Sequence, residues 1–331
     1  MRNLMSSRYL PPLGTAAIIL IITPFILNSP FWLDNSVMVA IFALMALSAG
    51  MAYGQAGILS IAPAAFASIG AFATGIVTTR YGLSPLIGLV LALLLPMVLA
   101  YPMARAISRL SPMPLSIATL LLSLVLELAI REGGGFTGGY IGLSGIPTLW
   151  FAPTIHAMHV LSWLSVVAVL VLYVNVTDSA LGRAVKTARH DPLRATADGV
   201  NVPAILASYF SLSAAVAGLA GWLYAHQLTY MGPDSLTMHV SIKVLLMAVI
   251  GGASTFLGPI VGAAFLTLIT LYLPAAETQG MIFGAVLILV LLVAPNGLLG
   301  TNWKRMFAGG AGRARTRAAS EPVPKPHEEL A

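Results

Sequence analysis

The stretch 54–72, GQAGILSIAPAAFASIGAF, interrupts the most apolar part of the chain with residues that a membrane-spanning helix avoids. The interrupting residues are Gly54, Gln55, Gly57, Ser60 and Pro63. Glycine and proline break regular helical geometry, and backbone groups in contact with lipid cannot stay unpaired. The break must therefore lie against protein or line a water-filled path, and we expect it to line or gate such a path.

Composition places the chain among membrane proteins. Of its 331 residues, 58% are hydrophobic and 8% are charged, whereas soluble domains carry about 25% charged residues. We therefore predict an all-α polytopic membrane protein. The absence of cysteine excludes disulfides, thiolate metal sites and cysteine nucleophiles.

Ten apolar segments approach the roughly 20 residues that a transmembrane helix needs. They are 13–33, 36–53, 64–79, 84–104, 113–130, 159–176, 204–225, 241–252, 256–273 and 280–299. Segment 241–252 is too short to cross alone and is either a half-helix or leans on the residues after it. We predict eight to ten transmembrane helices, some of them broken or short, in a permease domain over residues 13–300.

The positive charges predict the topology, because Lys and Arg concentrate on the cytoplasmic side. With a cytoplasmic N-terminus (1–12) and an uncleaved first span, the cytoplasmic side receives most of the basic residues before the tail. These are Arg2, Arg8, Arg105, Arg109, Arg183, Lys186, Arg189 and Arg194. The opposite side receives Arg80, Arg131 and, at most, Lys243. An even number of spans with both termini cytoplasmic fits this distribution, and the basic tail 301–331 is expected to be disordered, membrane-adjacent and not a nucleic-acid binder.

Two connections are longer than turns. The outer one, 131–158, is glycine-rich, and it follows a Glu127–Arg131 spacing that suits an ion pair; we weigh an interfacial lid against a ligand role for Glu127. The inner one, 177–203, has helical spacing from Ser179 to His190, with Asp178 or Ser179 as the cap. Asp191 suits the N-cap of a second helix that stops at Gly199. This connection is either a docking element or a solvated basic loop.

A second break lies late in the chain, in IGGASTFLGPIVG (250–262). Its candidate residues are Gly251, Gly252, Ser254, Gly258 and Pro259. Paired interruptions of this kind point to a transport pathway, and helix N-termini facing a break could receive a carboxylate. The alternative is close helix packing, which we expect of the alanine-rich part, 64–73.

The sequence lacks motifs for ATP binding, proton coupling and catalysis. There is no Walker A motif, no intramembrane acidic pair or proton relay, and no nucleophile–base arrangement. His156 and His159 have the spacing HxxH but no carboxylate companion, which argues against a metal site. The chain is therefore expected to be a transport subunit without enzymatic activity, driven by an external motor.

Several ordered blocks carry a family resemblance. GQAGILSIAPAAFASIGAF (54–72), SALGRAVKTARHDPLRATADGVNV (179–202), SYFSLSAAVAGLAGWLYAH (208–226), PDSLTMHVSIKVLLMAVIGGASTFLGPIVGAAF (233–265) and APNGLLG (294–300) follow each other in that order. In these blocks the chain resembles the LivM-type permease subunit of bacterial branched-chain amino acid ABC importers.

The resemblance implies the partners and the site of coupling. It implies a heterodimer with a LivH-type permease in the bacterial inner membrane, two cytoplasmic ATPases that use ATP and Mg, and a periplasmic solute-binding protein. No cofactor is expected on this chain. The residues that match the coupling pattern are Gly182, Arg183, Arg189, Asp191, Ala197 and Gly199. Thr196 and Asp198 depart from the family's usual Glu and Met.

The resemblance favours ATP-driven uptake of branched-chain or related small amino acids. Permeases of the same kind for urea, amides or small carboxylates are the alternative, and an ion-coupled secondary transporter or a scaffold protein without flux is a more distant one. The sequence does not identify the transported molecule, because in such importers the binding protein does much of the selection.

Overall fold

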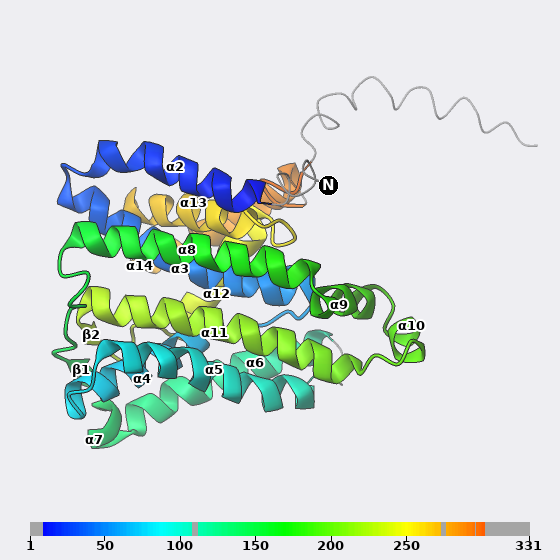
Figure 1. Ribbon diagram of the computed structural model, residues 1–331, viewed down its shortest axis with the longest axis horizontal. Coiled ribbons are helices and arrows are strands. Elements are labelled where there is room, and N and C mark those ends of the chain that lie inside the picture. The colour runs from blue at the N-terminus through cyan, green and yellow to red at the C-terminus, as the bar shows by residue number, and fades with distance from the viewer. Residues whose placement is uncertain (1–8, 108–111, 273–275, 295, 302–331) are drawn as a thin grey trace, which may run out of the picture. The chain divides into compact units, whose positions relative to one another are not determined.

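The computed structural model describes residues 9–107, 112–272, 276–294 and 296–301 (Figure 1). Over these residues the chain is almost entirely helical. Five helices are long and apolar enough to cross a membrane, and shorter apolar helices accompany them in the same part of the chain. The prediction of an all-α polytopic membrane protein is confirmed. The predicted N-terminus (1–12) falls mostly outside the described residues, as do Arg109 and the tail from residue 302 onward.

The elements have the following bounds. The helices are α2 (Leu10–Ile26), α3 (Pro30–Ala49), α4 (Pro63–Arg80), α5 (Pro85–Ile107), α6 (Pro112–Glu132), α7 (Gly134–Thr137), α8 (Ile155–Asp178), α9 (Ala180–His190), α10 (Pro192–Ala197), α11 (Val202–Leu228), α12 (Met238–Gly251), α13 (Gly258–Tyr272) and α14 (Ala276–Val293). A π-helix, η1 (Gly50–Gln55), continues α3. Two short strands, β1 (Leu143–Ser144) and β2 (Tyr230–Met231), pair antiparallel.

Each predicted apolar segment corresponds to one helix, although several boundaries differ. The expected first span, 13–33, is wrong: α2 ends at Ile26, and residues 30–33 already belong to α3. The reason is Pro30, whose fixed φ suits the first position of a new helix. The predicted short segment 241–252 is α12, which has 14 residues.

Side-chain caps begin the helices of the connection 177–203 as the sequence predicts. Ser179 accepts from the Gly182 N–H at the start of α9, so Ser179 and not Asp178 is the cap. Asp191 accepts from the Arg194 N–H at the start of α10. Such caps satisfy backbone donors that have no partner within the helix.

Small residues bring three helices into close contact. A Cβ atom at Gly221 of α11 would lie 1.8 Å from the carbonyl oxygen of Ala67 on α4, and one at Gly218 would lie 1.9 Å from that of Ala92 on α5. At Gly70 of α4, a Cβ atom would lie 2.5 Å from the carbonyl oxygen of Gly218. The alanine-rich part of α4 is therefore packing surface, as predicted.

The helices run between two ends, which Figure 1 distinguishes. We call them the α9 end, where α9 and α10 lie, and the hairpin end, where β1 pairs with β2. At the hairpin end Arg131 binds Glu127 at 2.9 Å and Asp234 at 2.6 Å, so the predicted Glu127–Arg131 pair forms and has a third member.

His226 anchors the outer connection to the bundle. His226 is 3% exposed. Its Nε2 contacts the Thr74 hydroxyl at 3.0 Å and its Nδ1 contacts the Pro147 carbonyl at 2.7 Å. The two contacts tie α11 to α4 and to the segment after β1.

Because α4 and α11 approach closely at Gly221, adding one methyl group there should lower the stability of the fold. Gly221→Ala should lower the melting temperature of the detergent-solubilised chain, because its Cβ atom would force two backbones apart, a change of roughly 1–3 kcal/mol. Gly284→Ala in α14 is the matched control, since nothing lies within 4 Å of its Cβ position. Equal melting temperatures for the two variants would contradict the packing described.

Candidate functional site

The first predicted break is real, and other helices pair its backbone. After η1 the chain is non-helical until α4 begins at Pro63. The Ile61 N–H donates to the Thr119 hydroxyl at 3.0 Å, and the Ser123 hydroxyl donates to the Ile61 carbonyl at 3.0 Å. Both side chains belong to α6. The break therefore lies against protein, which meets the requirement that no backbone group be left unpaired in lipid.

The start of α4 is covered as well. The Ala64 N–H donates to the hydroxyl of Ser241, a fully buried residue of α12, at 3.1 Å. The sequence suggests a helix N-terminus that faces the break and could receive a carboxylate. The structure instead gives this Ala64 donor to a neutral hydroxyl within the protein.

The polar candidates of the first break have local partners. Ser60 is 5% exposed, and its hydroxyl accepts from the Ala62 N–H at 3.3 Å. Gln55 is half-buried at the end of η1, with its side chain beside the hydroxyl of Tyr173 on α8. Their role in a path stays a prediction.

The second break is also real. α12 ends at Gly251, Gly252 has a φ of 110°, and α13 begins at Gly258. The N–H groups of Leu298 and Leu299 donate to the carbonyls of Ile250 and Gly251, at 2.8 and 3.1 Å. The segment after α14 thus supplies partners for carbonyls that the end of α12 leaves unpaired.

The two breaks touch each other although some two hundred residues separate them in sequence. A Cβ atom at Gly54 would lie 1.8 Å from the carbonyl oxygen of Ala253. One at Gly50 would lie 2.6 Å from Cγ of Pro259. Only glycine allows this approach, which explains why η1 carries glycine at both positions. Ser254 lies exposed beside the contact.

Arg189 links the connection 177–203 to the first break. Its Nη1 donates to the Gly54 carbonyl oxygen. Gly57, with a φ of 71°, would place a Cβ atom 3.3 Å from Cγ of Arg189. Arg189 lies on α9, so one side chain joins α9 to the first break, which in turn contacts the second break through Gly54 and Ala253. We call this contact region, made of Gly50, Gly54, Gly57, Ala253, Pro259 and Arg189, the break junction.

The remaining predicted coupling residues shape α9 and α10. Gly182 is buried, and a Cβ atom there would lie 2.3 Å from the carbonyl oxygens of Val176 and Thr177 at the end of α8. Arg183 donates to the Asp178 carbonyl at 2.7 Å. Ala197 is exposed at the end of α10, and Gly199 ends that helix with a φ of 80°. These contacts hold α9 against the end of α8.

Sequence reasoning missed Leu193, which is 84% exposed on α10. It projects from a short helix that lies beyond the ends of α8 and α11 (Figure 1). Its side chain leaves an apolar group on the surface of α10, outside the bundle. Its position directly after the capped Asp191-Pro192 start was the available signal.

The histidines of the HxxH pair have protein partners. His156 Nε2 contacts the Leu27 carbonyl at 3.2 Å, and His159 Nε2 contacts the Thr23 hydroxyl at 3.2 Å. Within the described part of the chain, no group of three or more His, Cys, Asp or Glu side chains could hold a metal ion.

Paired helix interruptions inside a polytopic helical bundle define the class of protein: a multi-pass membrane transport protein. Residues 32–291 match the family model described as the permease component of branched-chain amino acid transport systems. The chain belongs to this family.

Individual relatives agree with the family match. The chain is 26% identical to the high-affinity branched-chain amino acid transport system permease LivM of Salmonella typhimurium, over 80% of this chain and 69% of the relative. It is also 26% identical to the permease LivH of the same organism, over 78% of this chain and 91% of the relative. The autoinducer 2 import permease LsrC of Escherichia coli is 29% identical over 43% of this chain. No solved structure matches the chain.

The break junction predicts which residues Arg189 protects. Arg189→Ala should increase amide hydrogen exchange in residues 54–58, because a partly exposed charged hydrogen bond of about 1 kcal/mol changes a local opening equilibrium roughly five-fold. Lys186→Ala, an exposed position on the same helix, is the control and should leave that exchange unchanged. Equal exchange in both variants would show that Arg189 does not hold the break.

Proposed function

We propose that this chain is the LivM-type permease subunit of an ATP-driven ABC importer for branched-chain or related small amino acids. The observation that carries the proposal is Arg189, which extends from the exposed helix α9 into the first break. Membership of the branched-chain amino acid permease family supports the transport role. A connection between an exposed helix and an interrupted membrane helix is what a subunit driven from outside requires.

In the proposed mechanism, α9 and α10 form the coupling element. An ATPase contacts Leu193 and the end of α10, and its closure moves α9 together with the end of α8. Arg189 carries that movement to Gly54, and the contact between Gly54 and Ala253 passes it to the second break. Both interrupted helices then reorient together, which gives alternating access around the breaks.

The topology follows from the distribution of charge. Among the described residues, the α9 end carries Arg105, Arg183, Lys186, Arg189 and Arg194. At the hairpin end the described residues include Arg80 and Arg131. We therefore assign the α9 end to the cytoplasm, with both termini on that side. The hairpin end would then face the periplasm of a bacterial inner membrane.

The proposed partners follow from the family and from this topology. A LivH-type permease completes the membrane channel as a heterodimer, and the similarity of this chain to LivH permeases supports two subunits of one fold. Two cytoplasmic ATPases bind and hydrolyse ATP with Mg, so this chain itself is not an enzyme. A periplasmic solute-binding protein delivers the substrate at the hairpin end.

Urea, amides and small carboxylates are alternative substrates, and ligand binding by the cognate solute-binding protein distinguishes them. An ion-coupled secondary transporter is the rival mechanism. Uptake that collapses with a protonophore and persists without the ATPases would favour that rival. Co-purification of an ATPase with this chain in mild detergent favours the importer.

Leu193 tests the docking contact. Leu193→Ser should weaken ATPase binding roughly ten- to hundred-fold, because burial of a leucine side chain contributes about 1.5–3 kcal/mol. ATP-dependent uptake by the reconstituted importer should fall accordingly, with normal membrane insertion. Thr196→Ser on the same helix keeps its hydroxyl and is the control. Wild-type ATPase affinity in Leu193→Ser would remove Leu193 from the interface.

The capped ends of α10 test whether its helical form matters. Asp191→Ala removes a cap worth about 1 kcal/mol, and Gly199→Ala strains a left-handed position by about 1–2 kcal/mol. The double variant should melt this six-residue helix and uncouple transport, measured as uptake per ATP hydrolysed. Asp198→Asn, at the residue between these two positions that directly precedes Gly199, should neither melt the helix nor uncouple transport. Unchanged uptake per ATP hydrolysed in the double variant would contradict the assignment of α10 to the coupling element.

A further inference from the structure

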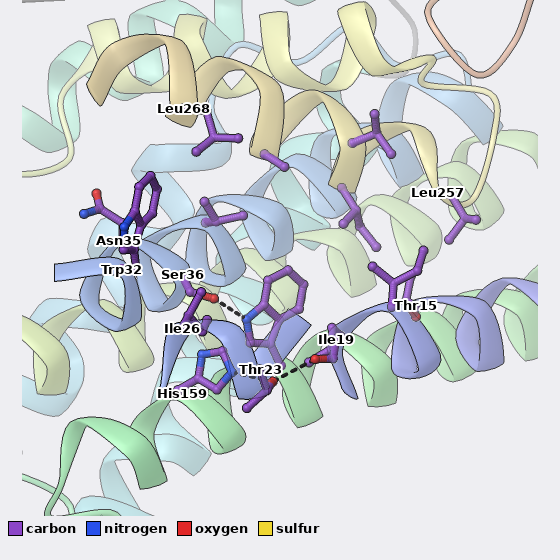
Figure 2. A pocket seen from close by; sticks show the side chains of 16 residues that line it. Thr15, Ile19, Thr23, Ile26, Trp32, Asn35, Ser36, His159, Leu257 and Leu268 are labelled. Carbon is purple, nitrogen blue, oxygen red and sulfur yellow. Dashed lines mark hydrogen bonds between the residues drawn. The ribbon is translucent and has the colours of Figure 1, made fainter. Parts of the chain in front are cut away.

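A groove of about 440 Å³ lies between α2 and α13, with α3 and α8 as its floor (Figure 2). α2 packs on α8, whereas α13 packs on α3 and α12, and the groove fills the space between these two sets of contacts. It lies on the opposite side of α13 from the break junction's η1, so the proposed coupling mechanism does not use it.

Two matching helical stripes form the walls. On α2 the lining runs from Thr15 to Ile26, and on α13 from Leu257 to Leu268, at helical i, i+3/i+4 spacing. Each stripe covers eleven residue steps, or about 16 Å at the 1.5 Å rise of an α-helix. The hydrocarbon region of one leaflet is about 15 Å thick, half of the roughly 30 Å core of a bilayer. The groove therefore has the length of one leaflet's acyl chains.

The lining changes character along this length. Trp32, Asn35, Ser36 and His159 lie toward the end marked by Leu268, whereas the end at Leu257 and Thr15 is apolar apart from the Thr15 hydroxyl (Figure 2). These four side chains belong to the first turns of α3 and α8, and both helices begin at the hairpin end. Among the lining residues that the structure describes, none is an acid, a lysine or an arginine. Aromatic and polar side chains above an apolar slot match the arrangement of a lipid at the membrane interface.

Most polar groups toward the apolar end of the lining have partners in the protein, whereas the buried Nδ1 of His159, at the polar end, has none among the described residues. Trp163 Nε1 donates to the Ser36 hydroxyl at 2.9 Å, and the Thr15 and Thr23 hydroxyls donate to backbone carbonyls of α2. The Trp163 ring is thus left as apolar surface in the wall. An occupant of the groove needs to supply hydrocarbon contact and no hydrogen bonds at depth.

The size of the groove selects among apolar occupants. An acyl chain of one leaflet, about 15 Å long, matches the groove's length of about 16 Å and needs no hydrogen bonds from its walls. The outer face of α2, with Leu13, Leu20 and Ile21 exposed, would meet lipid directly. We propose that a phospholipid of the hairpin-end leaflet inserts one acyl chain between α2 and α13.

This lipid would have a consequence for the second break. Leu257 lines the deep end of the groove and directly precedes Gly258, where α13 begins. The end of the acyl chain therefore contacts the residue next to the break. Removal of the acyl chain should leave α13 without packing contacts on one side. Transport by the assembled importer should therefore depend on acyl-chain length.

Tryptophan fluorescence tests the site directly, because Trp163 lies in the groove wall. The full chain is reconstituted in phosphatidylcholine vesicles with brominated or unbrominated acyl chains, and the Trp163 signal is obtained by difference from Trp163→Phe. Bromine atoms in the groove should quench more than half of this signal. Ala264→Phe fills the groove and should remove most of that quenching, whereas Ala285→Phe, exposed on α14, should not.

Three results would overturn the proposal. Quenching of Trp163 by aqueous iodide and not by brominated chains would show a water-filled groove. Quenching in the isolated chain that disappears in the assembled importer would show that a partner subunit covers it. Equal quenching in the wild-type chain and in Ala264→Phe would show that lipid reaches Trp163 by another route. A phospholipid retained by the wild-type chain and lost in Ala264→Phe, seen by native mass spectrometry, would support the proposal independently.

Discussion

The backbone groups of an interrupted helix within a bilayer must be paired by protein or by water in a path, because lipid offers them no partner. This chain meets the requirement with side chains from helices far away in sequence. Thr119 and Ser123 of α6 pair Ile61, and Ser241 of α12 pairs Ala64. Each break is therefore fixed by its neighbours, and a movement of one neighbour is felt at the break.

The same requirement explains why the two breaks lie together. Each break removes side-chain bulk through glycine, and the two glycine-rich segments fill each other's space, with Gly54 against Ala253. Arg189 adds a fixed cation to this contact, bound to the carbonyl of Gly54. Helix α9, which lies outside the bundle, thereby contacts the segment where the two interrupted helices meet. The account of transport rests on this contact.

The sequence was sufficient for features that depend on neighbours in the chain. Asp191 and Gly199 bound α10 as predicted, since a cap and a left-handed stop act over three or four residues. The glycines and prolines located both breaks for the same reason. Features that depend on distant residues were not accessible: the hydroxyl partners of the breaks, the burial of His226 and the direction of Arg189 all require knowing which helices are neighbours. The first helix was misplaced because Asn28-Ser29-Pro30 was read as the end of one span instead of a turn between two.

The chain contains no cysteine, so a disulfide across the break junction can be introduced without background. The Cβ position of Gly57 and Cγ of Arg189 are 3.3 Å apart, which suits a Gly57→Cys, Arg189→Cys pair. If α9 drives the break, the reduced pair should transport poorly, because Arg189→Cys removes the guanidinium that binds the Gly54 carbonyl. Oxidation joins α9 to the break covalently and should therefore raise ATP-dependent uptake by the reconstituted importer, whereas neither single variant should respond to oxidation. Unchanged uptake with the disulfide fully formed would contradict the account.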